Sequence, residues 1–93
     1  MKKLARRDKT KIYNDILFTI QDEAKKGTIV LTRVQQKTNV PFDRLKAYLT
    51  ELKELGLIQD ESSLKLTEKG KQFLSEYEKV LDFMKRMGLI YQR

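Results

Sequence analysis

The chain has 93 residues, of which 40% are hydrophobic, and its 20 Lys and Arg against 13 Asp and Glu give a formal net charge of +7. A chain of this length closes one hydrophobic core and leaves no room for a second independent domain. Because it has neither cysteine nor histidine, disulfides, thiolate or imidazole metal sites and histidine-activated nucleophiles are excluded. We therefore expect a protein that is not an enzyme, with no cofactor and no metal.

The sequence has no apolar run approaching the ~18 residues of a membrane span. Its basic N-terminus is not followed by the apolar block of a secretory signal. These features predict a soluble protein of the cytoplasm.

The first predicted helix covers residues 8–26. Asp8 is suited to cap its N-terminus and Gly27 to end it, while Lys25 and Lys26 suit the negative end of the helix dipole. Apolar residues recur there at spacings of three and four, which predicts one buried helical face. They are Ile12, Tyr13, Ile16, Leu17, Ile20 and Ala24.

After Gly27, the sequence predicts a brief extended stretch over residues 28–31 and then a short second helix. Thr32 is the expected cap of this helix, Val34 its inward-facing residue and Lys37 its end. A turn follows at residues 39–41, because Pro41 has no amide hydrogen and biases Val40 away from helical geometry.

A third helix is predicted over residues 42–55, with Gly56 as its left-handed stop. Two short strands, residues 57–59 and 64–66, then form a hairpin around the polar turn 60–63, with Leu64 and Leu66 facing the core and Lys65 facing outward. Thr67 caps the last helix.

This order of elements predicts a winged helix-turn-helix, an α+β fold that is mainly α. The expected organisation is a basic N-terminal arm (residues 1–7), the winged helix-turn-helix domain (8–66), a C-terminal dimerisation helix (67–88) and a short tail (89–93). Such an architecture lays one helix in a DNA groove and a hairpin beside it.

The last helix carries an apolar seam that continues beyond the length a small domain can cover at ~1.5 Å rise per residue. The first turns of this helix are expected to pack on their own domain. In the alternative interpretation, the whole helix packs only on its own domain and forms no dimer. A second copy of the chain covers the remainder most simply. The predicted interface consists of Phe73, Tyr77, Val80, Leu81, Met84 and Met87, with Phe83 alongside.

Most of the excess positive charge lies near the N-terminus, since residues 1–37 hold ten Lys and Arg against four Asp and Glu, and residues 38–93 hold ten against nine. This asymmetry favours a polyanionic partner, whose phosphates release counterions on binding. A basic surface that only maintains solubility is the alternative. The predicted phosphate-binding side chains are Arg6, Arg7, Lys9, Lys11 and Arg33, with Lys65 on the wing.

The face of the third helix opposite its apolar stripe would read bases. It consists of Asp43, Lys46, Ala47, Thr50 and Lys53, with Arg44 at its edge as a further DNA-binding residue. Lys46 can donate to guanine or to phosphate, Thr50 can donate or accept, and Ala47 is small enough to touch a thymine methyl. In the alternative interpretation the charges of this helix cancel through ion pairs at spacings of three and four. The charged residues concerned are Arg44, Lys46 and Lys53 against Asp43, Glu51 and Glu54.

The residues that carry a resemblance to a known family are Arg6, Arg7, 12–17, 32–34, Asn39, Leu45, Tyr48, Leu49, Leu52, 56–58 and 64–70. In these residues the chain resembles the archaeal ten-kilodalton winged-helix DNA-binding proteins of the Sulfolobus "ten-a" class. The resemblance implies duplex DNA binding by the third helix and the wing, and homodimers joined as a coiled coil of antiparallel C-terminal helices. The chain differs from the family in having Pro41 before the third helix and an acidic wing without glycine.

The functional prediction is a dimeric protein that binds duplex DNA as a transcriptional regulator or chromatin-associated factor. The alternative is a winged-helix module that docks another protein and binds no DNA, as the neutral third helix and the acidic wing would favour. Affinity for DNA that falls steeply with salt distinguishes the first from the second.

Overall fold

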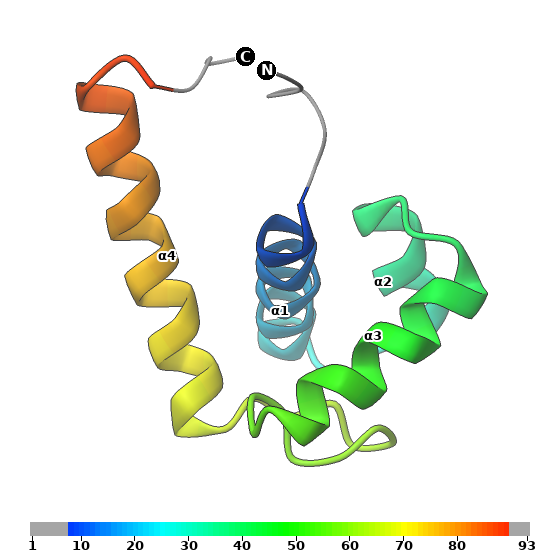
Figure 1. The fold of residues 1–93 in the computed structure, drawn as a ribbon. Helices are drawn as coiled ribbons and strands as arrows, with labels where there is room; N and C mark the ends of the chain where they lie inside the picture. The colour runs from blue at the N-terminus through cyan, green and yellow to red at the C-terminus, as the bar shows by residue number, and fades with distance from the viewer. Residues whose placement is uncertain (1–7, 90–93) are drawn as a thin grey trace.

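The computed structural model describes residues 8–89, which contain the helices α1 (Lys9–Lys25), α2 (Leu31–Thr38), α3 (Phe42–Glu54) and α4 (Glu68–Arg86). Figure 1 shows α1 in the middle of the molecule, α2 and α3 on one side of it and α4 on the other. The described part of the chain is therefore mainly helical, as predicted.

The ends of α1 are set by local signals, and both predictions for them are confirmed. The Asp8 carboxylate accepts a hydrogen bond of 2.9 Å from the backbone N–H of Lys11, which satisfies one free donor of the first turn. Gly27 follows the helix with φ 123°, a backbone conformation that residues with a Cβ rarely adopt. Ile16, Leu17 and Ile20 of this helix are all buried.

The start of α2 differs from the prediction. Val30 is the N-cap, and its carbonyl accepts the backbone N–H groups of Arg33 and Val34 at 3.0 and 3.1 Å. Thr32 therefore lies inside the first turn, and its predicted capping role was wrong. The helix starts early because Leu31 is half-buried against the core, and burial outweighs the missing side-chain cap.

The turn between α2 and α3 forms where it was predicted. Asn39 ends α2 with φ 58°, and extended Pro41 precedes α3 as its N-cap. Val40, between them, is buried in the same core as Leu45 of α3, so buried residues hold the chain on both sides of Pro41.

One hydrophobic core lies between α1, α2, α3 and the segment that connects α3 to α4. Each fully buried aliphatic side chain contributes roughly 1.5–3 kcal/mol to the stability of this core. The buried apolar residues are Ile16, Leu17, Ile20, Val34, Val40, Leu45, Leu49, Leu52, Leu57, Ile58 and Leu64.

The connecting segment does not form the two predicted strands. No strand is found within residues 8–89; a single antiparallel bridge joins Ile58 to Leu66, next to a 2.8 Å hydrogen bond from the Gln59 N–H to the Lys65 carbonyl. Leu64 turns the chain with φ 51°, which breaks the extended conformation after only a few residues. The wing is thus a loop held by one bridge, with Leu64 buried as predicted.

The start of α4 is pressed against this loop. Thr67 caps the helix as predicted, because its hydroxyl accepts the Gly70 N–H at 3.0 Å and donates to the Gly56 carbonyl at 2.6 Å. A Cβ on Gly70 would lie 2.2 Å from the Leu57 carbonyl oxygen, so only glycine allows this approach. Gly70 therefore fixes the direction in which α4 leaves the domain.

The two halves of α4 have different surroundings. Phe73 and Leu74 pack against the core, whereas Val80, Phe83 and Met87 are exposed. Figure 1 shows the second half extending away from the rest of the fold. In the part of the chain that the structure describes, no helix combines the length and apolar character needed to cross a bilayer.

Candidate nucleic-acid interface

The outer face of α3 carries the side chains that were predicted to read bases. Arg44, Lys46 and Ala47 are exposed, and Thr50 is half-exposed with its hydroxyl donating to the Lys46 carbonyl at 3.2 Å. The opposite face of the same helix is fixed in the core by three buried leucines. The core therefore determines the orientation in which α3 presents its polar side chains to solvent.

Among the described residues, no carboxylate forms an ion pair with the basic side chains of this face. None of the ion pairs found within residues 8–89 includes Arg44, Lys46 or Lys53. The Lys46 ammonium instead lies 5.7 Å from the centroid of the Phe42 ring, a cation–π contact one helical turn away. The ion pairs that would neutralise α3 internally are thus absent from the described structure.

Glu51, one of the carboxylates expected to neutralise α3, is bound to α1. It accepts a hydrogen bond from the Tyr13 hydroxyl and lies 3.4 Å from the Lys9 ammonium. Burial and the bond to Glu51 raise the pKa of Tyr13 to about 12, and the same hydrogen bond lowers the pKa of Glu51. The negative charge of Glu51 is therefore directed toward α1 and away from the outer face of α3.

A buried carboxylate that the sequence analysis did not single out connects α1 to α2. Glu23 is only 1% exposed, and its two oxygens accept hydrogen bonds of 2.8 Å from Arg33 Nε and 2.6 Å from Lys37 Nζ. Lys26 Nζ lies 3.8 Å from the same carboxylate. Hydrogen bonds from Lys37 and then Arg33 lower the pKa of Glu23 to about 2, and the bond to Glu23 raises that of Lys37.

A signal for Glu23 was present in the sequence. It lies three residues after Ile20 and seven after Ile16, so it lies on the apolar face of α1. A carboxylate at such a position must find cationic partners when the helix packs. Those partners lie ten and fourteen residues further along the chain, on another helix.

The remaining predicted phosphate-binding side chains differ in their exposure and in their ion pairs. Arg6 and Arg7 lie outside the described residues. Lys9 is exposed, and Lys11 is paired with Asp15 at 2.9 Å one turn along α1. Half of the Arg33 side chain is exposed, although its Nε is bound to Glu23.

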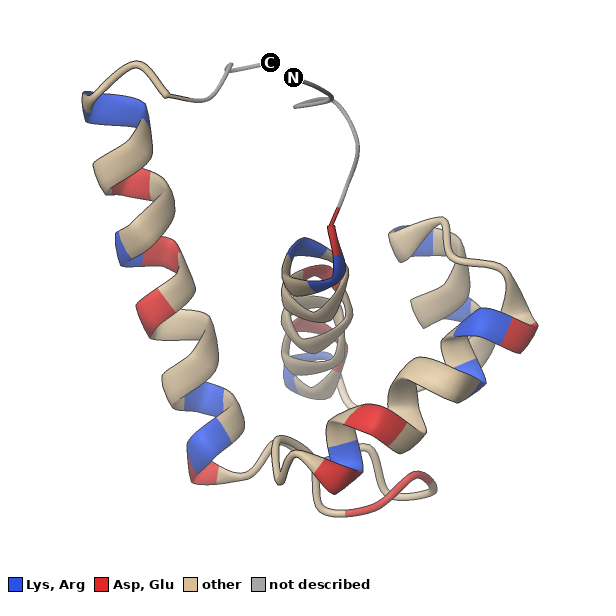
Figure 2. Cartoon of the chain, in the orientation of Figure 1, with Lys and Arg blue, Asp and Glu red and all other residues tan. Residues whose placement is uncertain are grey.

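The wing presents negative charge beside its single lysine. Lys65 is exposed, but the neighbouring turn contains Asp60 and Glu61, and Figure 2 shows this acidic loop at the edge of the molecule. Backbone N–H groups of Ser63 and Ser62 bond the Asp60 carboxylate at 2.7 and 2.8 Å, and with the Ser62 hydroxyl they lower its pKa. Asp60 is therefore bound within its own turn.

Comparison with known protein families is consistent with this arrangement of elements. A family profile described as winged helix-turn-helix matches residues 6–90. The chain belongs to this family. No curated protein and no solved structure matches the chain.

In a winged helix-turn-helix the second helix of the motif, here α3, is the one that enters the DNA groove. Domains of this kind are typically DNA-binding modules without enzymatic activity. The exposed face that Arg44, Lys46, Ala47 and Thr50 form is therefore the surface of this winged helix-turn-helix at which DNA is expected.

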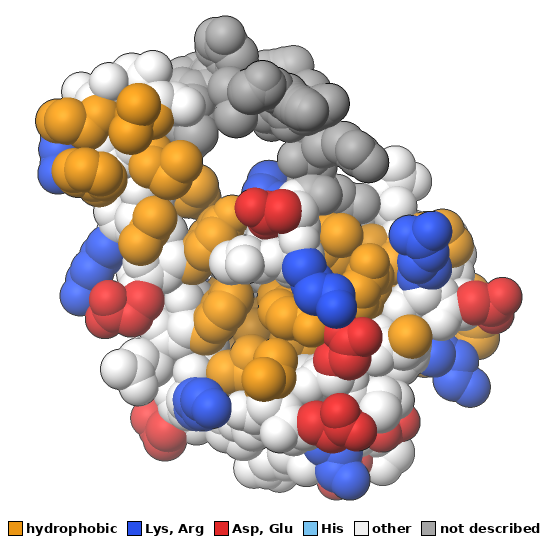
Figure 3. Space-filling model, viewed as in Figure 1, with side chains coloured by type: hydrophobic (Ala, Val, Ile, Leu, Met, Phe, Trp, Pro, Cys, Tyr) orange, Lys and Arg blue, Asp and Glu red, His pale blue; other side chains and the backbone are white. Residues whose placement is uncertain are grey.

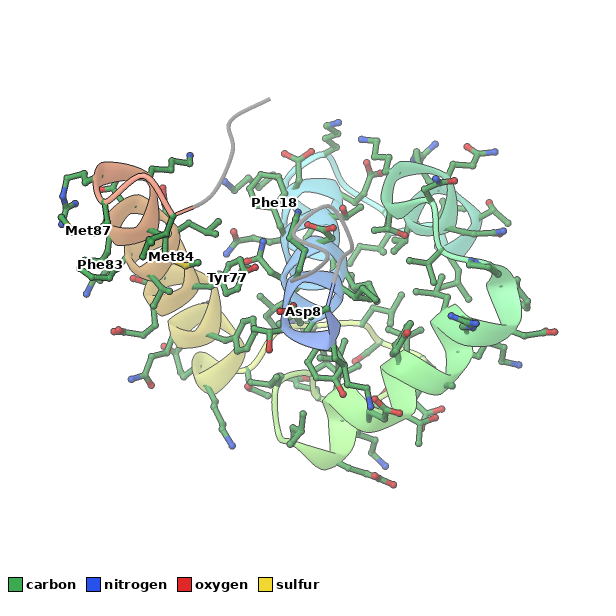
Figure 4. All side chains as sticks on the ribbon, turned by 45° about the horizontal axis from the view of Figure 1, so that its top comes forward. Asp8, Phe18, Tyr77, Phe83, Met84 and Met87 are labelled. Atoms are coloured by element: carbon green, nitrogen blue, oxygen red, sulfur yellow. The ribbon has the colours of Figure 1, made fainter. Side chains whose placement is uncertain are left out.

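A second surface of the winged helix-turn-helix is apolar and lies on the outer half of α4. Val80 is 51% exposed, Phe83 49% and Met87 56%, and Figure 3 shows hydrophobic side chains gathered there. In Figure 4, Phe83 and Met87 lie on the side of α4 away from α1, and Tyr77 and Met84 on the side toward it.

The other predicted interface residues of α4 have contacts inside the domain. Phe73 packs on the core and stacks on Tyr77 with 6.1 Å between ring centroids. Tyr77 and Leu81 line a groove of about 420 Å³ between α4 and α1, where Phe18 is 59% exposed. The apolar residues of α4 with the most exposure are thus Val80, Phe83 and Met87.

Proposed function

We propose that this protein is a homodimer that binds duplex DNA through α3 and its basic N-terminal region, as a transcriptional regulator or chromatin-associated factor of the nucleoid. The observation that carries the proposal is the outer face of α3, where Arg44 and Lys46 are exposed and take part in none of the ion pairs found in residues 8–89. Cations in this state are available to bind phosphates or base edges without first breaking an internal pair.

Contacts with base edges would come from three residues of α3. Lys46 donates to guanine acceptors or to a phosphate, Thr50 donates or accepts, and Arg44 at the edge of the face reaches the backbone or a guanine. Ala47 is small, so α3 can approach the floor of the major groove closely. This set supports modest sequence specificity.

Phosphate contacts would come from the start of α1 and from α2. Lys9 and Lys11 can exchange their surface pairs with Glu51 and Asp15 for a phosphate at small cost. Arg33 offers its terminal nitrogens while Glu23 holds its Nε, which fixes the direction of the guanidinium. Arg6 and Arg7 would extend this row from the N-terminal arm.

Homodimers would form through the apolar surface of α4. Three large apolar side chains, each about half-exposed on adjacent turns, favour burial against an identical surface. Val80, Phe83 and Met87 follow one another at spacings of three and four, so they lie on one face of α4 that a second copy of the chain can cover.

The arrangement of two heads on one pair of helices is the one that the resemblance to the archaeal ten-kilodalton class implies. The dimer then presents two α3 helices to the same duplex, and binding at one head raises the effective concentration of the other. We infer that the two heads act together on DNA.

Titration of a labelled duplex with the full chain at several salt concentrations tests the DNA-binding proposal. Each phosphate contact contributes about −0.9 to the slope of log K against log salt, so several contacts give a steep fall in affinity. An absence of binding even at the lowest salt would reject the proposal and favour the protein-docking module.

Light scattering tests the dimer. The wild-type chain is expected at twice its 11.0 kDa mass, and Phe83→Lys is expected at the monomer mass, because a lysine would bury its charge in the interface. The matched control is Gln72→Lys, which adds the same residue to an exposed position nearer the start of α4. A monomeric wild type, or a dimeric Phe83→Lys, would contradict the interface.

A further inference from the structure

Phe42, the first residue of α3, is a large apolar side chain that the domain leaves outside its core. It is 41% exposed and is absent from the apolar residues that pack on the core. Val40 and Leu45, which precede and follow it in the sequence, are both buried in the core. The core is therefore formed without the ring of Phe42.

Phe42 lies in the same row as the proposed base-reading residues. Phe42, Lys46 and Thr50 are spaced four residues apart, so their side chains follow one another along one face of α3. The Lys46 ammonium rests 5.7 Å from the Phe42 ring centroid. The row thus presents an apolar surface with a hydrogen-bond donor directly beside it.

The major-groove edges of the four bases differ in whether they can match this pair. Thymine alone has an apolar group in the major groove, its 5-methyl, and the O4 acceptor lies next to it. Adenine, guanine and cytosine offer only donors and acceptors there. An apolar ring beside an ammonium therefore complements the edge of thymine.

On the basis of the proposed DNA binding, we propose that Phe42 determines specificity by contacting the 5-methyl group of thymine, with Lys46 donating to the adjacent O4 or to a neighbouring guanine. The first residues of a recognition helix are those that reach base edges. The Phe42 ring lies at that end of α3 and is exposed there.

The test compares two duplexes of equal length, alternating d(AT) and alternating d(AU), which differ only in the 5-methyl groups. At one fixed salt concentration, the wild-type chain is expected to bind the thymine duplex about fourfold more tightly per methyl buried. Phe42→Ala is expected to bind both duplexes equally, at about the wild-type affinity for the uracil duplex.

The matched control is Leu55→Ala, which removes a similarly exposed apolar side chain (46%) at the opposite end of α3. It is expected to keep the preference for thymine. Equal binding of the two duplexes by the wild type overturns the inference, and this comparison needs no variant to fold. A preference that persists in folded Phe42→Ala also overturns it, because another residue then contacts the methyl.

The outcome for the proposed function is separate. If the wild type binds neither duplex at any salt concentration, DNA binding itself is rejected. If it binds both with equal, salt-dependent affinity, DNA binding stands and only the thymine contact fails.

Discussion

The helices α2 and α3 both carry exposed cations, but the two sets have different partners. On α2, Arg33 and Lys37 are bound to the buried Glu23 of α1. On α3, Arg44 and Lys46 have no ion pair within the described residues, and Lys46 rests on an aromatic ring. The cations of α2 thus hold two helices together, and those of α3 are available to an external anion.

The largest expected effect on stability comes from removing the carboxylate that α2 depends on. Glu23→Ala should lower the melting temperature by roughly 5–15 °C, because the position is buried and two cations lose their partner. Thermal unfolding followed by circular dichroism measures the change. Glu54→Ala is the control, since that carboxylate is exposed and belongs to none of the ion pairs found in residues 8–89; an equal loss there would contradict the assignment.

Acid should remove the contribution that the Glu23 carboxylate makes to the stability of the fold. The pKa of Glu23 is lowered from 4.5 to about 2 by its bonds to Lys37 and Arg33, so its stabilisation is complete above pH 4.5 and is lost as pH falls toward 2. Melting curves of wild type and Glu23→Gln should therefore converge over this range. A constant difference between the two proteins from pH 7 to pH 2 would show that charge is not the cause.

A lysine exchanged on each helix sharpens the comparison. Lys37→Ala should lower the melting temperature by a few degrees, because Glu23 loses a 2.6 Å hydrogen bond. Lys46→Ala should change it by less than about 2 °C, since only a surface cation–π contact is lost. Equal decreases in melting temperature for the two variants would contradict the proposal that Lys37 holds two helices together while Lys46 does not.

The features of the fold that depend on local chemistry could be predicted from the sequence. Asp8 and Gly27 mark the ends of α1, Gly56 follows α3, and Thr67 caps α4, because each acts on a backbone group within a few residues. The order of these signals was sufficient to predict the winged helix-turn-helix that the family match supports.

The features that depend on contacts between distant residues were missed or were predicted wrongly. Thr32 is a good local cap, yet burial of Leu31 moved the start of α2. The predicted wing strands are too short to persist once Leu64 adopts a positive φ angle. Spacing within α3 did not show that Glu51 would bond Tyr13, which lies 38 residues earlier.

The candidate site was predicted in the same uneven way. The outer face of α3 follows from helical spacing, so Arg44, Lys46 and Thr50 could be named from the sequence. The sequence could not show whether the charges of these residues are paired, because pairing depends on the rotamers and partners of the folded chain. The exposure of Phe42 also became visible only when the core was complete.

The central claim is that the outer face of α3 is the DNA-binding surface, and a charge-matched pair of variants tests it most directly. Lys46→Ala and Lys71→Ala each remove one positive charge, the first from α3 and the second from α4, where Lys71 pairs with Glu68 at 3.6 Å. The measurement is the slope of log K against log salt for a fixed duplex. We predict weaker binding and a slope reduced by about one for Lys46→Ala if it contacts phosphate, or a base-dependent loss if it reads a base, with little change for Lys71→Ala. Identical curves for the two variants would contradict the account.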